Sequence, residues 1–172
     1  GVFESTARSI HHALDRLDGD DTDPETRECY HFQNMCPVVP EGLVQMTMGT
    51  PAAIYNGGLL QTHLTYHDPR RNRPGLPEDV AAMVTSVSAD GARVELVNLD
   101  PIGSRDLVIQ AGAFGEHEFT SVETATKGDR LAATGQYLTV HLGPGSEETL
   151  RLGLRRYTNQ PAYRRPPAEV GA

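Results

Sequence analysis

Residues 138–157 (LTVHLGPGSEETLRLGLRRY) constrain the fold most, because two segments with alternating apolar residues flank a short turn. Leucine or valine occupies every second position in 138–142 and again in 150–154. Side chains alternate between the two faces of a strand, so this rhythm predicts two strands that each bury one face. Glycine and proline at 143–145 supply the turn, since glycine reaches positive φ without a clash and proline fixes its own φ. A lone hairpin is marginal in water, so we expect this one to lie in a larger sheet.

Four earlier segments also carry strand-like apolar residues between turns: 82–88, 92–99, 106–111 and 117–124. The Asp90-Gly91 pair between the first two favours a hairpin. Six short strands at this spacing are typical of an antiparallel sandwich. We therefore predict a mainly β fold, an antiparallel Greek-key β-sandwich with a short N-terminal helix and a long irregular arm.

The composition agrees with a protein of strands and loops. Hydrophobic residues make up 38% of the 172 positions, Trp is absent, and there are 17 Gly and 12 Pro. This bias is more typical of strand proteins than of helix bundles. A chain of this length suits one domain with one core.

The N-terminal segment predicts a helix over 5–17, with Ser5 as its N-cap and Gly19 as its C-terminal stop. So short a helix is marginal alone and must pack on something. Its apolar residues recur every three or four positions and form one stripe: Ala7, Ile10, Leu14 and Leu17. The acidic run 19–23 resembles a calcium loop, but it lacks the downstream glycine and bidentate glutamate, so we predict a solvated loop.

Residues 24–77 follow no clean period over any long window. The segment 42–48 predicts one strand, and 52–60 is a second short apolar piece. An irregular segment of this length usually has a function or contacts another domain. We interpret it as an arm that lies across a surface outside this chain. The predicted organisation is helix and arm at 1–77, β-sandwich at 78–160 and a proline-rich extended tail at 161–172.

The charge and hydropathy of the chain bear on its partners. A net charge of -8, with Lys127 as the single lysine, argues against nucleic acid and anionic membrane surfaces. No apolar run approaches the length of a spanning helix, so we expect a soluble chain that does not enter a membrane. Five arginines gather near the C-terminus, where we expect them to cover an acidic neighbouring surface rather than nucleic acid: Arg151, Arg155, Arg156, Arg164 and Arg165.

Redox state and compartment stay open at this point. Cys29 and Cys36 are seven residues apart, and a disulfide or two free thiols are both ordinary outcomes. The first residues lack the basic and apolar regions of a signal peptide. Since the sequence begins with Gly1, we expect a processed chain or an internal piece, and the localisation is unassigned.

The segments 93–122 and 139–157 together resemble the C-terminal β-sandwich appended to many glycoside hydrolases and related carbohydrate-active enzymes. In those modules a strand that ends in Asn-Leu precedes a loop, and the last two strands flank a Pro-Gly turn. Asn98, Leu99, Pro144 and Gly145 carry the resemblance here. It implies that catalysis belongs to a larger preceding domain, and it transfers no catalytic residue to this chain.

Three histidines are the candidate metal ligands. His63 and His67 share a face on a helix or on a strand, and His117 could supply the third ligand that zinc needs. The reading we favour is that all three are polar residues of a surface or an interface. No cofactor is predicted.

Four residues are candidates for catalysis: Glu116, Glu118, His67 and Asp68. Glu116 and Glu118 point to one side of a strand, and glycoside cleavage commonly uses two carboxylates. His67 and Asp68 belong to the densest polar group of the chain. For the two glutamates we favour the alternating charge of a solvated strand face.

Tyr66, Arg70, Arg71 and Arg73 are the candidate binding residues. An arginine cluster can hold a carboxylate or a sugar acid through bidentate hydrogen bonds. The arginine cluster can also dock on acidic side chains of a partner domain, and this is the role we favour.

These features favour a non-catalytic β-sandwich module or subunit that packs on a catalytic domain and stabilises it. The partner we expect is a carbohydrate-active catalytic domain, and the other possibility is a second copy of this chain. A small metal-dependent hydrolase built on His63, His67 and His117 is the alternative, and an enzyme here would be glycoside hydrolase-like. A sugar-binding module is a third reading, which the 6% aromatic content and the lack of Trp disfavour.

Overall fold

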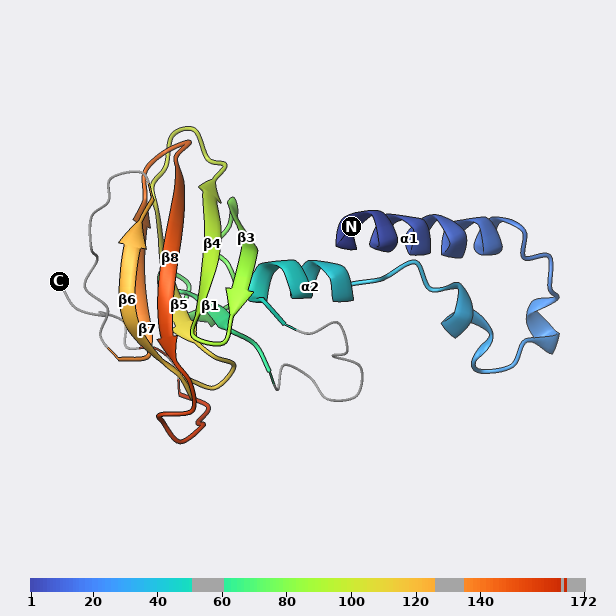
Figure 1. Ribbon diagram of the computed structural model, residues 1–172. Helices are drawn as coiled ribbons and strands as arrows, with labels where there is room; N and C mark the ends of the chain where they lie inside the picture. Colours follow the sequence, from blue (N-terminus) through green and yellow to red (C-terminus); the bar gives the residue numbers. More distant parts are fainter. Residues whose placement is uncertain (51–60, 126–134, 165, 167–172) are drawn as a thin grey trace.

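The computed structural model of the chain describes residues 1–50, 61–125, 135–164 and 166. Within these ranges the protein is mainly β, with two four-stranded antiparallel sheets and two α-helices (Figure 1). One sheet has the order β2-β1-β5-β7 and the other β3-β4-β8-β6. The strands are β1 (Leu64–Asp68), β2 (Arg73–Pro74), β3 (Val80–Ser88), β4 (Gly91–Asn98), β5 (Arg105–Ala111), β6 (Glu118–Thr124), β7 (Tyr137–Leu142) and β8 (Glu147–Arg155).

Both sheets contribute to one hydrophobic core. Along β4 buried residues alternate with partly exposed ones over the whole strand, as expected when one face of a strand packs inward. Leu96 and Leu150 from one sheet and Leu107 and Leu138 from the other are fully buried in the same cluster. Burial of these aliphatic side chains, at about 25 cal/mol per Å² of apolar surface, is the main force that holds the sheets together.

The six predicted strands are present, but the predicted hairpin at 138–157 is wrong. β7 pairs with β5, whereas β8 pairs with β4 and β6 in the other sheet. The chain therefore crosses between sheets at the glycine and proline turn. Alternation indicates that each strand buries one face, and it does not identify the neighbouring strand. The predicted hairpin between 82–88 and 92–99 is confirmed as β3 and β4.

Asn98 joins this crossing to the connection between β4 and β5. It is 1% exposed, and its Nδ2 donates hydrogen bonds to the carbonyls of Gly103 and Gly143, both at 2.8 Å. Its Oδ1 accepts from the backbone N–H of Asp100 at 3.1 Å. Gly145, at φ 57°, donates its own N–H to the Asp100 carbonyl at 2.8 Å. One buried amide thus satisfies the backbone of two connections that are far apart in the sequence.

The N-terminal half contains more regular structure than the sequence predicted. The segment 42–48, predicted as a strand, lies in helix α2 (Glu41–Met48), which ends at Gly49 in the left-handed conformation. Short apolar runs do not distinguish strand from helix, and here the glycine stop decides for a helix. Strand β1 begins at Leu64, inside the range assigned to the arm. The apolar piece at 52–60 and most of the tail lie outside the described residues.

Helix α1 (Val2–Asp18) contains the predicted range and is longer. Its N-cap is Gly1 rather than Ser5, and Gly19 ends it as predicted. Two short 3-10 helices follow, η1 (Pro24–Thr26) and η2 (His31–Met35). Cys29 and Cys36 flank η2 as exposed free thiols, so no disulfide joins them. Neither α-helix in the described ranges is long and apolar enough to span a membrane.

Candidate functional site

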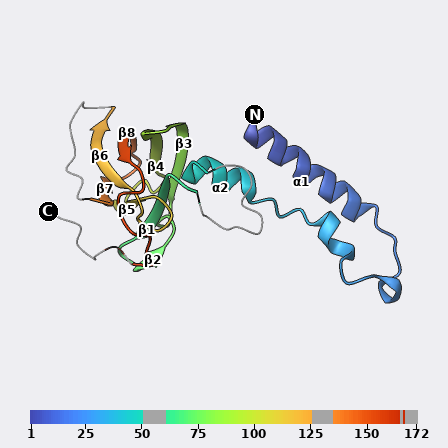
Figure 2. The same cartoon turned by 60° about the horizontal axis from the view of Figure 1, so that its bottom comes forward.

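Of the region predicted as helix and arm, 1–77, residues 1–48 project from the sheets. This shorter range is called the arm from here on. In two views α1 stands clear of both sheets, with α2 between them (Figures 1 and 2). Ala13 is the single buried residue of α1. Gly42 in α2 allows the two helices to approach closely, because a Cβ there would lie 2.1 Å from Thr6 Oγ1. Within the arm α1 packs on α2 and η2, and α2 also packs on β3 and β1 of the two sheets.

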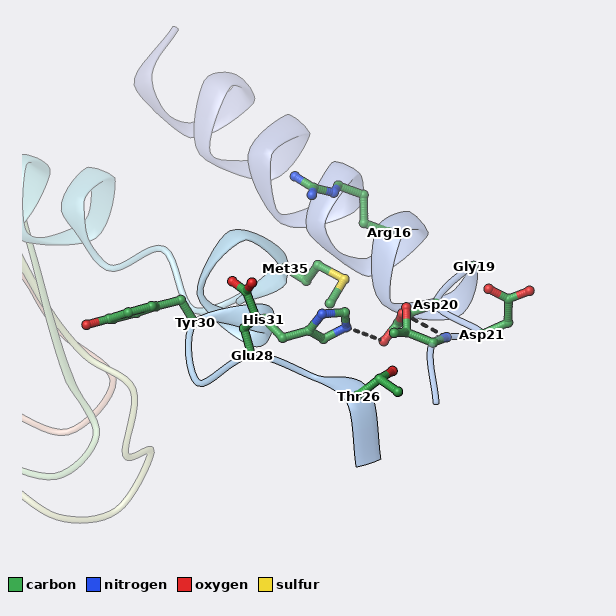
Figure 3. A pocket seen from close by; sticks show the side chains of 10 residues that line it. Arg16, Gly19, Asp20, Asp21, Thr26, Glu28, Tyr30, His31 and Met35 are labelled. Carbon is green, nitrogen blue, oxygen red and sulfur yellow. Dashed lines mark hydrogen bonds and ion pairs between the residues drawn. The ribbon is translucent and has the colours of Figure 1, made fainter. Parts of the chain in front are cut away.

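Asp20 organises the bend between α1 and η2. Its Oδ2 lies 2.9 Å from His31 Nε2 (Figure 3). The same oxygen lies 3.1 Å from Arg27 Nη2, and the Oδ1 accepts from the N–H of Thr22 at 3.2 Å. Hydrogen bonds from Thr22 and His31 hold the pKa of this carboxyl well below its usual range. Of the acidic run 19–23, predicted as a solvated loop, Asp20 thus binds side chains of its own chain, and the other residues of the run are exposed. The hollow beside them has a volume of about 660 Å³.

The arm exposes large apolar side chains along its length. On α1, Phe3 and Leu14 are exposed although the other side of the helix packs on α2 and η2. Single exposed apolar residues are normal on a protein surface. Six residues of the arm are between 45% and 72% exposed: Phe3, Leu14, Tyr30, Phe32, Val38 and Leu43.

Two predicted site residues anchor the arm to the sheets. The Tyr66 hydroxyl, on β1, donates to the Thr47 carbonyl of α2. Tyr66 is 5% exposed, and burial raises the pKa of its hydroxyl well above the usual range. His63 Nδ1 lies 2.7 Å from the carbonyl oxygen of Gly49, and its Nε2 lies 3.3 Å from that of Ser88. Both side chains therefore fix α2 against the sheets.

The three predicted metal ligands do not form a metal-binding group. In the part of the chain that the structure describes, no three His, Cys, Asp or Glu side chains are placed to hold a metal ion. His67 is buried on β1. His117 is also buried, and its Nδ1 accepts from the N–H of Tyr157 at 3.1 Å. Burial lowers the pKa of His117, an effect that the nearby Glu116 carboxylate partly offsets.

The predicted glutamate pair serves the fold. Glu116 is 4% exposed, and its carboxylate accepts the N–H of Ala113 at 3.1 Å and that of Phe114 at 2.7 Å. Glu118 forms an ion pair with Arg155 across the β6 and β8 strands. One carboxylate caps a buried turn and the other faces a neighbouring strand, so their geometry is not that of an acid and base around one bond.

The arginines of the turn between β1 and β2 differ in their surroundings. Asp68, which is buried, accepts the N–H of Arg71 at 3.1 Å and lies 3.5 Å from Arg73 Nε. Arg71 also pairs with Glu78. Arg70 is exposed, and its side chain has no partner among the described residues. Of the predicted cluster, Arg70 is thus the side chain best placed to meet another molecule.

A second hollow lies beside β1 and the start of the tail. Its volume is about 550 Å³, and Tyr66 and His67 contribute to its wall. Phe114 and Tyr163 meet edge to face there, with ring centroids 4.9 Å apart. The backbone N–H of Ala162 donates to the Phe114 carbonyl at 3.0 Å, which holds the tail against this rim. Tertiary structure therefore adds two aromatic residues that the sequence did not single out.

Among the described residues, the predicted catalytic side chains are engaged in caps or ion pairs or are buried. Of the eleven large apolar side chains that are exposed there, six lie on the arm and five on the sheets, their connections and the tail. Sequence analysis missed Tyr30, Phe32 and Val38, whose only signal was their place in a segment without period. Comparison of the chain with protein-family models, with curated proteins and with solved structures found no match.

Proposed function

We propose that this chain is a non-catalytic module, a β-sandwich with Greek-key connections, that packs on a catalytic domain through its arm and stabilises it. The observation that carries the proposal is the projecting arm with its six exposed apolar residues. A segment that buries so little of its own apolar surface gains stability when a partner covers it. The catalytic domain is the partner that the resemblance implies.

The partner we propose is a carbohydrate-active enzyme domain. The resemblance that suggests this class rests on Asn98, Leu99, Pro144 and Gly145, and in the structure Asn98 and Gly145 belong to the same pair of locked connections. This role supports a shared structural motif rather than a shared active site. It agrees with a module that supports catalysis performed by another domain.

Binding measurements test the proposal. The chain would be mixed with catalytic domains of carbohydrate-active enzymes from the organism that makes it, with affinity measured by biolayer interferometry and the melting temperature of each domain by calorimetry. We expect one domain to bind and to melt at a higher temperature in the complex, because a ligand of the folded state stabilises it.

Matched variants locate the contact. The side chains of Tyr30 and Val38 are 69% and 72% exposed. Replacing both by serine should weaken binding at least about tenfold, since aromatic anchors that become buried dominate interface energies. Ile102→Ser, at an 86% exposed position between β4 and β5, is the control and should leave affinity unchanged. Binding by none of the domains, or equal weakening by the control, would contradict the proposal.

The second hollow favours a sugar-binding module as a second candidate function. Tyr163 is 94% exposed and stands against Phe114, which offers an aromatic surface at the mouth of a cavity of a size usual for small ligands. Titration with mono- and oligosaccharides, followed by tyrosine fluorescence, tests it. Saturable binding that is lost in Tyr163→Ala and kept in Tyr30→Ser supports this candidate, and no saturable change rejects it.

A further inference from the structure

The outer face of the sheet β3-β4-β8-β6 carries two neighbouring rows of unusual composition. One row runs across the four strands as Ser86, Arg93, Arg151 and Glu123, because each faces the next in the strand register. The row beside it, two residues along each strand, contains only serine and glycine: Ser88, Gly91, Gly153 and Ser121. A row of long charged side chains therefore stands next to a row of very small ones.

Arg93 and Arg151 face each other across β4 and β8. Like charges directly opposite on neighbouring strands are destabilising. None of the ion pairs among the described residues includes Arg93 or Arg151. Arg93 Nε is buried and has no hydrogen-bond partner. Glu123 closes the row beyond Arg151, so two positive charges and one negative charge share it.

The small row forms the floor of a hollow of about 530 Å³, which both rows line. The floor must stay small, because a Cβ on Gly91 would lie 2.6 Å from the Leu152 carbonyl oxygen and one on Gly153 would lie 2.5 Å from Ser121 Oγ. Serine hydroxyls, the two guanidinium groups and the Glu123 carboxylate are the polar groups at its edge. Glu95, which follows Arg93 on the same face, does not line it.

We propose that this hollow binds a small hydroxylated acid, with the oxyanion held by Arg93 and Arg151 and the hydroxyl groups set against the serine row. A carboxylate or sulfate bridging the two guanidinium groups removes their mutual repulsion and forms charge-assisted hydrogen bonds. The low floor leaves room for a ring with hydroxyl groups, which Ser86, Ser88 and Ser121 can meet. The site lies on a different surface from the arm, so it does not depend on the proposed function.

Amide spectra of the chain test the site directly. The probes are glucuronate, inorganic sulfate and glucose, titrated into the ¹⁵N-labelled full chain. We expect glucuronate to shift the amide signals of Gly91 and Gly153 saturably, sulfate to shift them more weakly, and glucose to leave them in place. A response to glucose equal to that of glucuronate would overturn the charge recognition, and sulfate binding without glucuronate binding would overturn the hydroxylated ligand.

Arginine variants complete the test. Arg93→Gln and Arg151→Gln should each weaken glucuronate binding about tenfold, the loss expected for one charge-assisted hydrogen bond. Arg8→Gln, at an exposed arginine of α1 that does not line the hollow, is the matched control and should bind normally. No saturable shift at either glycine, or equal weakening in the Arg8 variant, would overturn the proposal.

Discussion

The two sheets and the arm differ in how much of their apolar surface they bury. The sheets bury leucines such as Leu138 and Leu150 completely, in a core to which both sheets contribute. The arm buries few side chains, among them Ala13 and Met35, and exposes six large apolar ones. Its internal order comes from a helix contact at Gly42 and from the Asp20 cluster.

This difference separates the stability of the protein from its capacity to interact. Burial of apolar surface is the main stabilising contribution in the sheets, since each buried leucine contributes about 1.5–3 kcal/mol. Most of the arm lacks that contribution, although Met48 of α2 packs against the core. If the arm stabilised the whole chain, this difference between the two regions would not hold.

The largest effect is expected in the core. Leu150→Ala should lower the free energy of unfolding by about 2–5 kcal/mol, because it removes buried methyl groups and leaves a cavity. Phe3→Ala should change it by less than about 0.5 kcal/mol, since its side chain is 51% exposed. Urea unfolding followed by far-ultraviolet circular dichroism measures both. Equal losses in the two variants would show that arm and sheets unfold as one unit.

A smaller effect is expected at the contact between α1 and α2. Gly42→Ala should loosen the arm, because the added Cβ would collide with Thr6 Oγ1, and overpacking of this kind costs about 1–3 kcal/mol locally. Hydrogen exchange should become faster in α1 and stay unchanged in β4 and β8. Gly1→Ala, where a Cβ meets no neighbour, is the control. Faster exchange throughout the sheets would contradict the separation.

The smallest effects are expected from titration, and they fall in different pH ranges for the two regions. His117 has a lowered pKa in the folded protein, so the unfolded chain binds the proton more tightly. The contribution of His117 to stability is complete above about pH 6.5, the ordinary pKa of histidine. It is lost as the pH falls toward the lowered pKa of His117 in the folded protein. Asp20 also has a lowered pKa. Its contribution is complete above about pH 4 and is lost only in stronger acid.

Unfolding and exchange measured from neutral to acid pH check this order. Mild acid should destabilise the sheets, and His117→Asn, which keeps an acceptor for the Tyr157 N–H, should reduce that dependence. The residues around Asp20 should begin to exchange faster only at lower pH. Loosening of the arm before the sheets lose stability would reverse the expected order.

The alternation of apolar residues predicted strand positions well where a strand buries one face. The segments 82–88, 92–99 and 106–111 were located within two residues of β3, β4 and β5, because a period of two depends only on the strand itself. The candidate site was less predictable. Glu116 and Asp68 have the residue types of catalytic groups, and only their hydrogen bonds to backbone N–H groups identify them as turn caps.

The sequence by itself determined that this protein would be mainly β and which residues of its later strands would face a core. It also showed that residues 24–77 lack the regular apolar period of the later strands. Tertiary structure decided which strands are neighbours, placing β7 and β8 in opposite sheets. It also brought Arg93 opposite Arg151. The reason is physical: periodicity records the environment of each residue, whereas pairing depends on contacts between segments distant in the chain.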